Sequence, residues 1–375
     1  MKMKINKALI VGGGIGGMCA AIALRRIGIT VDLVEIQPEW QVYGVGIIQQ
    51  NNVVREMQRL GVLERYLDAA WSFDKVSLQT LEGHHLASFP GQRLAGTQFP
   101  ANVGISRLKL HEVLCSTAVE LGTTITTGKT VDAFEQDEYG VDVVFNDQTM
   151  GRYDLLIGAD GIYSTIRDQL YGNRFIPRFT GQGVWRYNFP RPAWVDHLMC
   201  FISEEFNCGL VPLAADLMYL FVTSREPENP RFARHELAEQ MRCRIPDCGR
   251  MISELRDQIV DDAQVVYKPL EELFVDAPWF DNRVVLIGDA VHATTPHLGQ
   301  GAGMAIEDAL VLAETLHSDD DIQRALSNYY LRRHDRCYRI WRDSLRVGES
   351  EVNNDPLFDR QLVIREMMEF TARPI

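Results

Sequence analysis

A glycine-rich turn after the first apolar segment constrains the fold of this chain more than any other feature. The apolar run 7–11 leads into Gly12, Gly14 and Gly17 in the spacing G-x-G-x-x-G, and a helical pattern over 18–27 follows. In such a turn the first glycine permits a tight bend, the second lets backbone approach a pyrophosphate, and the third lets helix pack on strand. The pattern predicts a strand–turn–helix unit that binds a dinucleotide, with Ile15 and Gly16 inside the binding turn.

A second apolar run supports this interpretation. Residues 30–34 form a strand-like segment that ends at Glu35, about eighteen residues past the last glycine. An acid at that distance is expected to bind ribose hydroxyls. Strand, glycines, helix, strand and acid in this order make the motif far more specific than a lone G-x-G-x-x-G.

Two later segments repeat the theme of a buried strand that ends in an acid. Residues 153–161 form an apolar run that ends in Asp160 and Gly161, before a predicted helix that starts near Ser164 and Arg167. The run 283–288 ends at Asp289. Continuous apolar character is typical of strands that are buried on both faces, as in a parallel sheet.

A Pro/Gly turn and an alanine-rich helix, expected over 306–316, follow Asp289. The turn contains Pro296, Gly299, Gly301, Ala302 and Gly303. Glycines here would leave backbone N–H groups and the positive end of a helix dipole open to an anionic or partly anionic ligand.

The rest of the chain divides between helices and strands. Antiparallel strands are expected over 73–99 and a helix over 109–121, with Ser106 as its N-cap and Arg107 at its start. A cation at a helix start is unfavourable next to the helix dipole, so Arg107 either binds an anion or is an ordinary surface residue. Strand-like runs dominate 177–278, and Asp321 follows two acids that would cap a long helix after 322.

Composition excludes several classes of protein. The net charge is −13, which disfavours nucleic acid as a partner. The seven cysteines form no CxxC pair and no metal-like cluster with histidine, so we predict reduced thiols, a cytoplasmic location and no metal. The uncharged run 8–24 imitates a signal peptide, but it carries five glycines and is short for a membrane span.

Taken together, the three motifs resemble the class A, single-component FAD-dependent aromatic monooxygenases, the group of the 4-hydroxybenzoate and 3-hydroxybenzoate hydroxylases. The resemblance covers nearly the whole chain. It implies an α/β fold in which a Rossmann-like FAD-binding domain holds an interposed mixed β-sheet substrate domain. The predicted segments are FAD-binding 1–72, 101–176 and 279–335, substrate-domain 73–100 and 177–278, and C-terminal helices 336–375.

The resemblance also assigns roles to residues. The three glycines would hold the FAD pyrophosphate, Glu35 the adenosine ribose, and Arg107 the pyrophosphate region. Asp160 is linked to FAD and to transient nicotinamide binding, and Asp289 to the ribityl or pyrophosphate region. The loop from Gly44 to Gln50, with Gly46 and Ile47, would border the isoalloxazine. The Pro296 to Gly303 turn would face the ring edge that becomes anionic on reduction.

The same resemblance implies the chemistry and the partners. NADH or NADPH would reduce the flavin, and O2 would add to give a C4a-hydroperoxide that hydroxylates a small aromatic or N-heteroaromatic substrate. The cofactor does this chemistry while the protein excludes water and orients the substrate. A homodimer is the default expectation.

Substrate contacts are harder to predict. Relatives place them on strands of the second region, which makes Trp185, Arg186, Asn207, Cys208 and Tyr219 candidates. Of these we predict Arg186, Tyr219 and Asn207 as pocket residues, with Arg186 as a carboxylate binder if it points inward. An ordinary structural role is the competing interpretation for each.

Two other functions compete with the monooxygenase. A flavin enzyme that does not oxygenate carbon, such as a halogenase or dehydrogenase, is one, although none of the six tryptophans forms the W-x-W motif of halogenases. A non-enzymatic nucleotide-binding protein is the other, and the intact glycine turns disfavour it.

Overall fold

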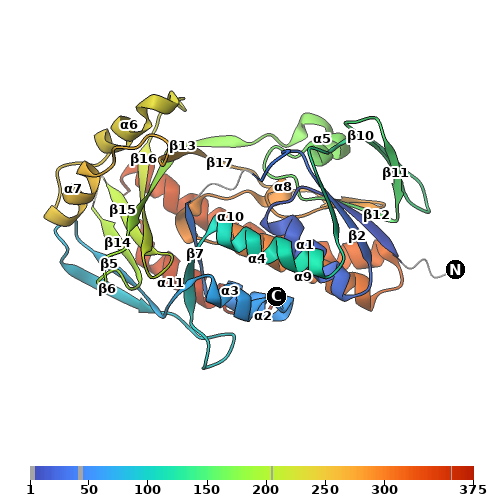
Figure 1. The fold of residues 1–375 in the computed structure, drawn as a ribbon, viewed down its shortest axis with the longest axis horizontal. Coiled ribbons are helices and arrows are strands. Elements are labelled where there is room, and N and C mark those ends of the chain that lie inside the picture. Colours follow the sequence, from blue (N-terminus) through green and yellow to red (C-terminus); the bar gives the residue numbers. More distant parts are fainter. Residues whose placement is uncertain (1–4, 41–44, 204–205, 356) are drawn as a thin grey trace.

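The computed structural model describes residues 5–40, 45–203, 206–355 and 357–375 and shows two lobes (Figure 1). The first lobe is built on a six-stranded sheet in the order β18-β19-β12-β1-β2-β8. All neighbours pair in parallel except β18 and β19. The strands are β1 (Lys7–Val11), β2 (Thr30–Glu35), β8 (Thr124–Thr127), β12 (Leu155–Gly158), β18 (Phe280–Asp281) and β19 (Val284–Leu286).

Helices pack on this sheet because its central strands are apolar on both faces, as their sequence predicts. Strand β12 is buried at every position, and β19 likewise. The helices of this lobe are α1 (Ile15–Arg26), α2 (Asn51–Leu60), α3 (Leu63–Asp68), α4 (Arg107–Glu120), α5 (Thr165–Tyr171), α8 (Asp289–His292) and α9 (Gly301–Ser318). A small antiparallel sheet of β9 (Val131–Gln136), β10 (Val141–Phe145) and β11 (Met150–Tyr153) extends the lobe beside the N-terminus (Figure 1).

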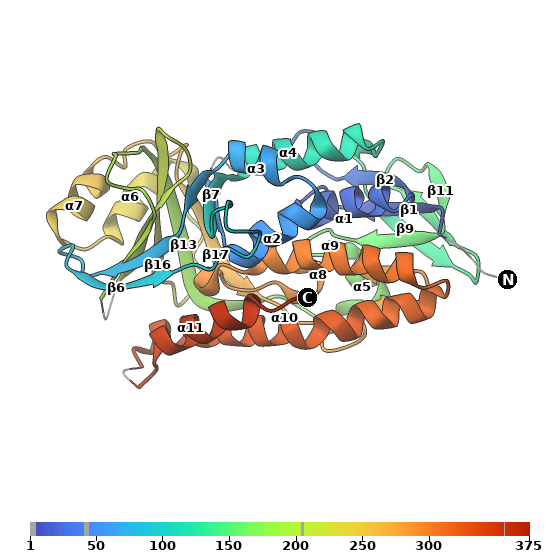
Figure 2. The same cartoon turned by 90° about the horizontal axis from the view of Figure 1, so that it is seen from below.

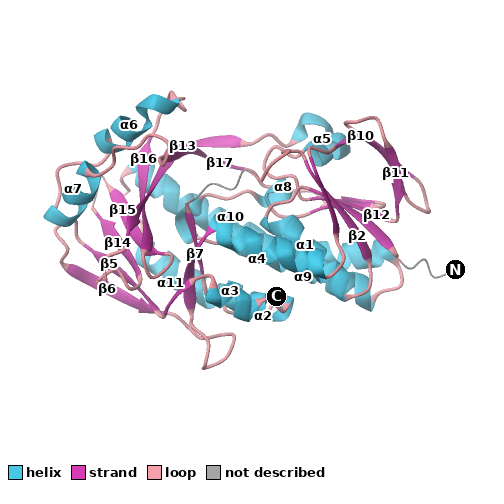
Figure 3. Ribbon diagram, viewed as in Figure 1, coloured by secondary structure: helices cyan, strands magenta, loops and turns pink. Residues whose placement is uncertain are grey.

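The second lobe is a seven-stranded mixed sheet in the order β17-β13-β16-β15-β14-β5-β6. Its strands are β5 (Lys75–Gln79), β6 (His85–Pro90), β13 (Arg178–Pro190), β14 (Leu198–Ile202), β15 (Asn207–Pro212), β16 (Leu217–Arg225) and β17 (Val266–Glu272). Helices α6 (Leu237–Cys243) and α7 (Arg250–Asp257) cover its outer face (Figures 1 and 3). The early strands β5 and β6 therefore join strands that follow about a hundred residues later, which is the interposed mixed sheet that the resemblance implies.

Two connecting layers hold the lobes together. A three-stranded sheet of β3 (Gly46–Gln49), β7 (Asn102–Ser106) and β4 (Trp71–Phe73) lies between them. Helix α10 (Ile322–Asn353) runs beneath both lobes, and α11 (Arg360–Thr371) folds back against it (Figure 2). Asp321 caps α10, since its carboxylate accepts hydrogen bonds from the backbone N–H groups of Gln323 and Arg324. Within the described residues, no helix is long and apolar enough to cross a membrane.

Candidate functional site

A cavity of about 500 Å³ lies at the carboxyl ends of the parallel strands. Strands β2, β1, β12 and β19 are neighbours in that order, so the turns that follow β1, β12 and β19 meet at one edge of the sheet. Residues 13–16, Ala159 with Gly161, and 287–289 all line the cavity. Three motifs far apart in the sequence thus form one site, and ligands of open α/β sheets bind at this edge.

The glycine turn has the geometry that its sequence predicts. A Cβ on Gly12, which has a φ of +108°, would overlap the carbonyl oxygen of Ala159. A Cβ on Gly17 would overlap the carbonyl oxygen of Gly12, because α1 packs directly on the turn. At Gly14 the built Cβ has no atom within 4 Å among the described residues, so this backbone is open to a ligand in the cavity.

The far end of the cavity, beside Glu35, contains aromatic side chains that sequence reasoning missed. Glu35 accepts hydrogen bonds from the N–H of Gly13 at 2.8 Å and from that of Gln37 at 2.9 Å. The indole of Trp40 packs over Gly13, and its ring centroid is 4.4 Å from that of His111. His111 follows Arg107 at i+4 on helix α4, and this spacing is the signal that could have placed His111 beside the same cavity.

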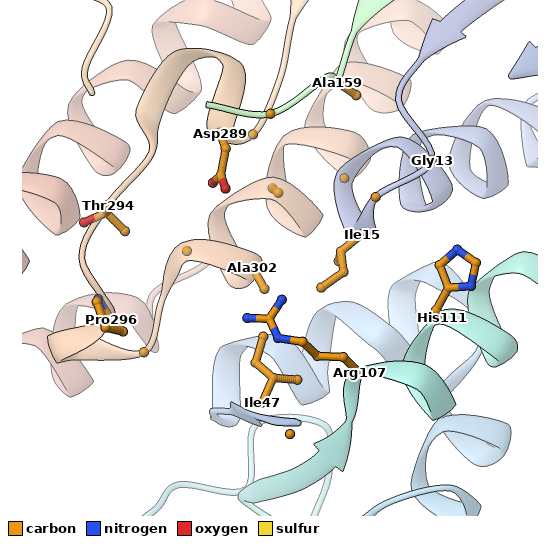
Figure 4. Close-up of a pocket in the computed structure, with 18 of the residues that line it drawn as sticks. Gly13, Ile15, Ile47, Arg107, His111, Ala159, Asp289, Thr294, Pro296 and Ala302 are labelled. Atoms are coloured by element: carbon orange, nitrogen blue, oxygen red, sulfur yellow. The ribbon is translucent and has the colours of Figure 1, made fainter. Parts of the chain in front are cut away.

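Two opposite charges face the cavity from opposite walls (Figure 4). The guanidinium of Arg107, on α4, has neither an ion pair nor a hydrogen bond with the described part of the chain, and burial lowers its pKa. The carboxylate of Asp289, on α8, is accessible from the cavity but enclosed by protein, so burial raises its pKa while His292 and Arg107 counteract the shift. An unpaired cation at a helix start fits a bound anion better than a surface role.

A buried charge cluster behind the cavity fixes the turn that carries Asp289. One oxygen of Asp308 accepts hydrogen bonds from the N–H of Gly288 at 2.9 Å and from Nε2 of His292 at 2.6 Å, and the other accepts one from Nε of Arg333 at 2.7 Å. Burial alone would raise the pKa of Asp308, but His292 and Arg333 outweigh it and lower the pKa to about 2. His292, Asp308 and Cys337 lie close enough to share an ion, but the Arg333 guanidinium already contacts Asp308 and Cys337 there.

Most of the predicted cofactor residues line this cavity. They are Gly14, Ile15, Gly16, Glu35, Gly46, Ile47, Arg107, Asp289, Pro296, Gly299, Gly301 and Ala302. Close packing also requires glycine at position 46, because a Cβ there would overlap Leu213 of the second lobe. Gly44, which begins the predicted isoalloxazine loop, lies outside the described residues. The assignment of each residue to a part of the cofactor stays a prediction.

Four predicted residues lie behind the cavity wall. Gly12 and Gly17 serve the close packing described above. The carboxylate of Asp160 accepts hydrogen bonds from the Ser164 hydroxyl at 2.5 Å and from the N–H groups of Thr165 and Ile166, so it caps α5. Gly303 lets α9 approach α2, since a Cβ there would lie 3.0 Å from Val53. Contact of these four with a cofactor stays a prediction.

A second cavity of about 190 Å³ adjoins the first. The two share five lining residues, namely Ile48, Arg186, Tyr219, Pro296 and Gly299. Arg186 and Tyr219 have side chains without a hydrogen bond or ion pair in the described part of the chain. Burial lowers the pKa of Arg186 to about 10 and raises that of Tyr219, so at neutral pH the guanidinium is charged and the phenol protonated.

The remaining substrate candidates differ in position. Asn207 and Cys208 line the second cavity, and Asn207 accepts a hydrogen bond from Arg360 at 3.3 Å. Trp185, a candidate but not one of the three predicted pocket residues, lines neither cavity, because alternate residues of a strand face opposite sides of the sheet. Its indole packs under α6 and α7 and donates to the Ser224 hydroxyl at 2.9 Å.

The comparisons with known proteins agree with this geometry. A family model described as an FAD binding domain matches residues 6–342. The chain belongs to this family. YetM of Bacillus subtilis, a provisional FAD-dependent monooxygenase, is 32% identical over 93% of this chain and 94% of its own length. The 3-hydroxybenzoate 6-hydroxylase of Polaromonas naphthalenivorans is 30% identical over 91% of this chain and 86% of its own length.

A solved structure extends the likeness to three dimensions. Klebsiella pneumoniae HpxO in complex with FAD and uric acid matches with a TM-score of 0.88 and 25% identity, over 98% of this chain and 97% of that chain. The resemblance to FAD-dependent monooxygenases is therefore confirmed, as are the Rossmann-like fold, the enzyme class and FAD as the cofactor.

The cavity of this flavoprotein suits its cofactor chemically. Gly14 exposes bare backbone, Arg107 offers an uncompensated cation, and Asp289 offers an acceptor for hydroxyl groups. Gly301 and Ala302 begin the 18-residue helix α9, whose N-terminal N–H groups face the cavity. Such an end favours a ring that gains negative charge on reduction.

Proposed function

We propose that the protein hydroxylates a small aromatic or N-heteroaromatic substrate, using NADH or NADPH and O2. The observation that carries the proposal is the junction of the two cavities at Arg186 and Tyr219. A substrate in the smaller cavity would present its ring to whatever fills the larger one. Bound FAD would supply the redox chemistry, taking electrons from the nicotinamide and delivering one oxygen atom of O2 to the ring.

The residues of the chain would bind, orient and enclose the substrate. Arg186 would pair with a phenolate, enolate or carboxylate oxygen, and its unpaired guanidinium supports this role. The Tyr219 hydroxyl would donate a hydrogen bond to the same end of the ring. Asn207 stays a predicted contact at the other end of the cavity. The surrounding apolar side chains would exclude water, which protects reactive intermediates from side reactions.

Relatives support the substrate class. HpxO was solved with uric acid, and the Polaromonas relative is a 3-hydroxybenzoate 6-hydroxylase. Uric acid and 3-hydroxybenzoate are both planar and acidic. The two enzymes thus act on, or bind, rings that an arginine can pair with. The cytoplasmic location and the homodimer remain predictions from the sequence.

The test is substrate-stimulated oxidation of NADH and NADPH by the purified yellow holoenzyme. Phenols, hydroxybenzoates, hydroxypyridines and oxopurines would be screened under ¹⁸O2, with product mass as the readout. Stimulated oxidation with one ¹⁸O in the product is expected. Stimulated oxidation that yields only peroxide for every ring would instead indicate a flavin enzyme that does not oxygenate carbon.

A further inference from the structure

The smaller cavity is elongated along the strands of the second lobe. Tyr219, Phe221 and Thr223 alternate along β16, and all three line the cavity. Alternate residues share one face of a strand, and four residues of rise span about 13 Å. Tyr219 lies at the junction with the larger cavity, so Thr223 marks the opposite end.

The C-terminal helices close that opposite end. Val347 and Glu351 come from α10, and Arg360 and Ile364 come from α11, each pair at i and i+4. Residues four apart lie on the same face of a helix, so both helices present one face to the cavity. The end wall therefore depends on a segment far from the cofactor motifs.

The polar groups at the two ends differ in whether they already have partners. At the opposite end, Arg360 pairs with Glu351 at 2.6 Å and donates to Asn207 at 3.3 Å, and Gln182 donates to Glu351 at 3.1 Å. The ring of His297 makes no hydrogen bond with the described part of the chain there, and its Nε2 lies 3.4 Å from Glu351. At the junction, Arg186 has no such partner in the described part of the chain. Charged groups that pair with one another need no charged ligand atom, whereas a buried unpaired guanidinium does.

Apolar side chains line the length between the two ends. They are Leu78, Leu198 and Phe221, and Val184, Ile202 and Val347 continue the apolar lining at the end marked by Thr223. A ligand that matches this wall has a polar head at the junction and an apolar body toward α11.

We propose that the substrate is an amphipathic aromatic acid or phenol whose apolar substituent runs along β16, and that Ile364 sets the greatest length of that substituent. The inference rests on the proposed function, because that function places the ring at the junction. An apolar cavity of about 150 Å³ takes benzene, which has six carbons. On that scale the 190 Å³ here, which includes the junction, holds about seven or eight non-hydrogen atoms of ring and substituent together.

The test uses 4-alkylphenols with chains from methyl to nonyl, titrated into the FAD-loaded enzyme. Binding is read from the change in the flavin absorption spectrum. Each buried methylene should tighten Kd about fourfold until the chain fills the cavity, after which Kd stops improving. The plateau should move to longer chains in Ile364→Ala and to shorter chains in Ile364→Phe.

Leu362→Ala is the matched control, since Leu362 lies on the same helix with 43% of its surface exposed. Leu362→Ala should leave the plateau unchanged. Arg186→Gln should raise the Kd of every alkylphenol by a similar factor without moving the plateau. A Kd that does not vary with chain length, or no spectral change with any alkylphenol, overturns the inference. A plateau that stays in place in both Ile364 variants overturns it as well.

The same titration separates this inference from the proposed function. If the alkylphenols bind with the expected plateau but none stimulates oxidation of NADH or NADPH to a hydroxylated product, the hydroxylase proposal fails and the shape of the binding site stands. If hydroxylation of a compact ring is found while the plateau is absent, the proposal for the substituent fails alone.

Discussion

Replacing Asp308 with asparagine should destabilise the protein and loosen the turn that carries Asp289. The carboxylate is fully buried and accepts hydrogen bonds from Gly288, His292 and Arg333. Its pKa falls from 3.8 to about 2, which corresponds to about 2 kcal/mol of favourable interaction. Breaking a buried pair costs about 3–5 kcal/mol when one partner is left uncompensated.

The expected loss lies at the lower end of these values. Arg333 also pairs with Glu307 at 2.7 Å, so it keeps a second counter-charge when Asp308 is neutralised. We therefore expect Asp308→Asn to lower the free energy of unfolding by about 2–3 kcal/mol, a large share of the roughly 5–15 kcal/mol of a typical domain. His292 loses its charged partner and should become easier to deprotonate.

The effect should depend on pH in a defined direction. The pKa of Asp308 is lower in the folded protein than in the unfolded chain, so its contribution is complete above pH 3.8 and disappears as the pH falls toward 2. The difference in stability between wild type and Asp308→Asn should therefore shrink between about pH 4 and pH 2. It should also decrease as the pH rises above 6.5, the ordinary pKa of histidine, because burial lowers the pKa of His292 but Cys337 and Asp308 outweigh it and raise the pKa.

Urea unfolding of the apoprotein measures this without the contribution of bound FAD, which would itself raise stability. Asp335→Asn is the control, because that carboxylate is 97% exposed on α10 and its loss should cost under about 0.5 kcal/mol. A double-mutant cycle with His292→Asn should give a coupling of about 1 kcal/mol or more. The reasoning is refuted if Asp308→Asn unfolds at the same urea concentration as Asp335→Asn.

Four further substitutions test the cavity itself. Gly17→Ala should prevent folding or strongly lower the Tm of the apoprotein, because its Cβ overlaps backbone. Gly14→Ala should keep the Tm and weaken FAD binding, because its Cβ points into open space. Equal Tm values for the two variants would contradict this reasoning. Arg186→Gln should weaken binding of a phenolate about 10–100-fold at unchanged FAD content, as expected for hydrogen bonds to a charged group, and an unchanged Kd would contradict the assignment. FAD added to apoprotein should quench tryptophan fluorescence less in Trp40→Phe than in wild type, since Trp40 lines the cavity; identical quenching would place the cofactor elsewhere.

The cofactor half of the site could be predicted from the sequence because its signals are local. Gly12 and Gly17 each have a packing reason to be glycine that a spacing pattern encodes, the backbone at Gly14 is open to the cavity, and Asp289 stands three residues after the end of a buried strand. Parallel neighbours align their carboxyl ends, so strand order then brings the motifs together.

The substrate half could not be predicted in the same way. Whether Arg186 or Trp185 faces the cavity depends on which side of β13 the helices cover, and that is decided by tertiary packing. The contribution of α11 depends on a return of the chain after α10 that leaves no periodic signal near the cavity. Asp308 lies in an alanine-rich helix, where its partner Arg333, 25 residues later, could not be deduced from spacing.

The alternation along β13 restricts how substrate choice can change over evolutionary time. A single-residue insertion upstream in that strand would swing the indole of Trp185 into the cavity and force the guanidinium of Arg186 into the apolar layer beneath α6 and α7. Both exchanges would destabilise the protein, so insertions and deletions are disfavoured in the regularly paired segment 183–190 of this strand. New preferences must instead arise by side-chain replacement, or in the C-terminal helices, where an added or lost turn leaves the sheet untouched.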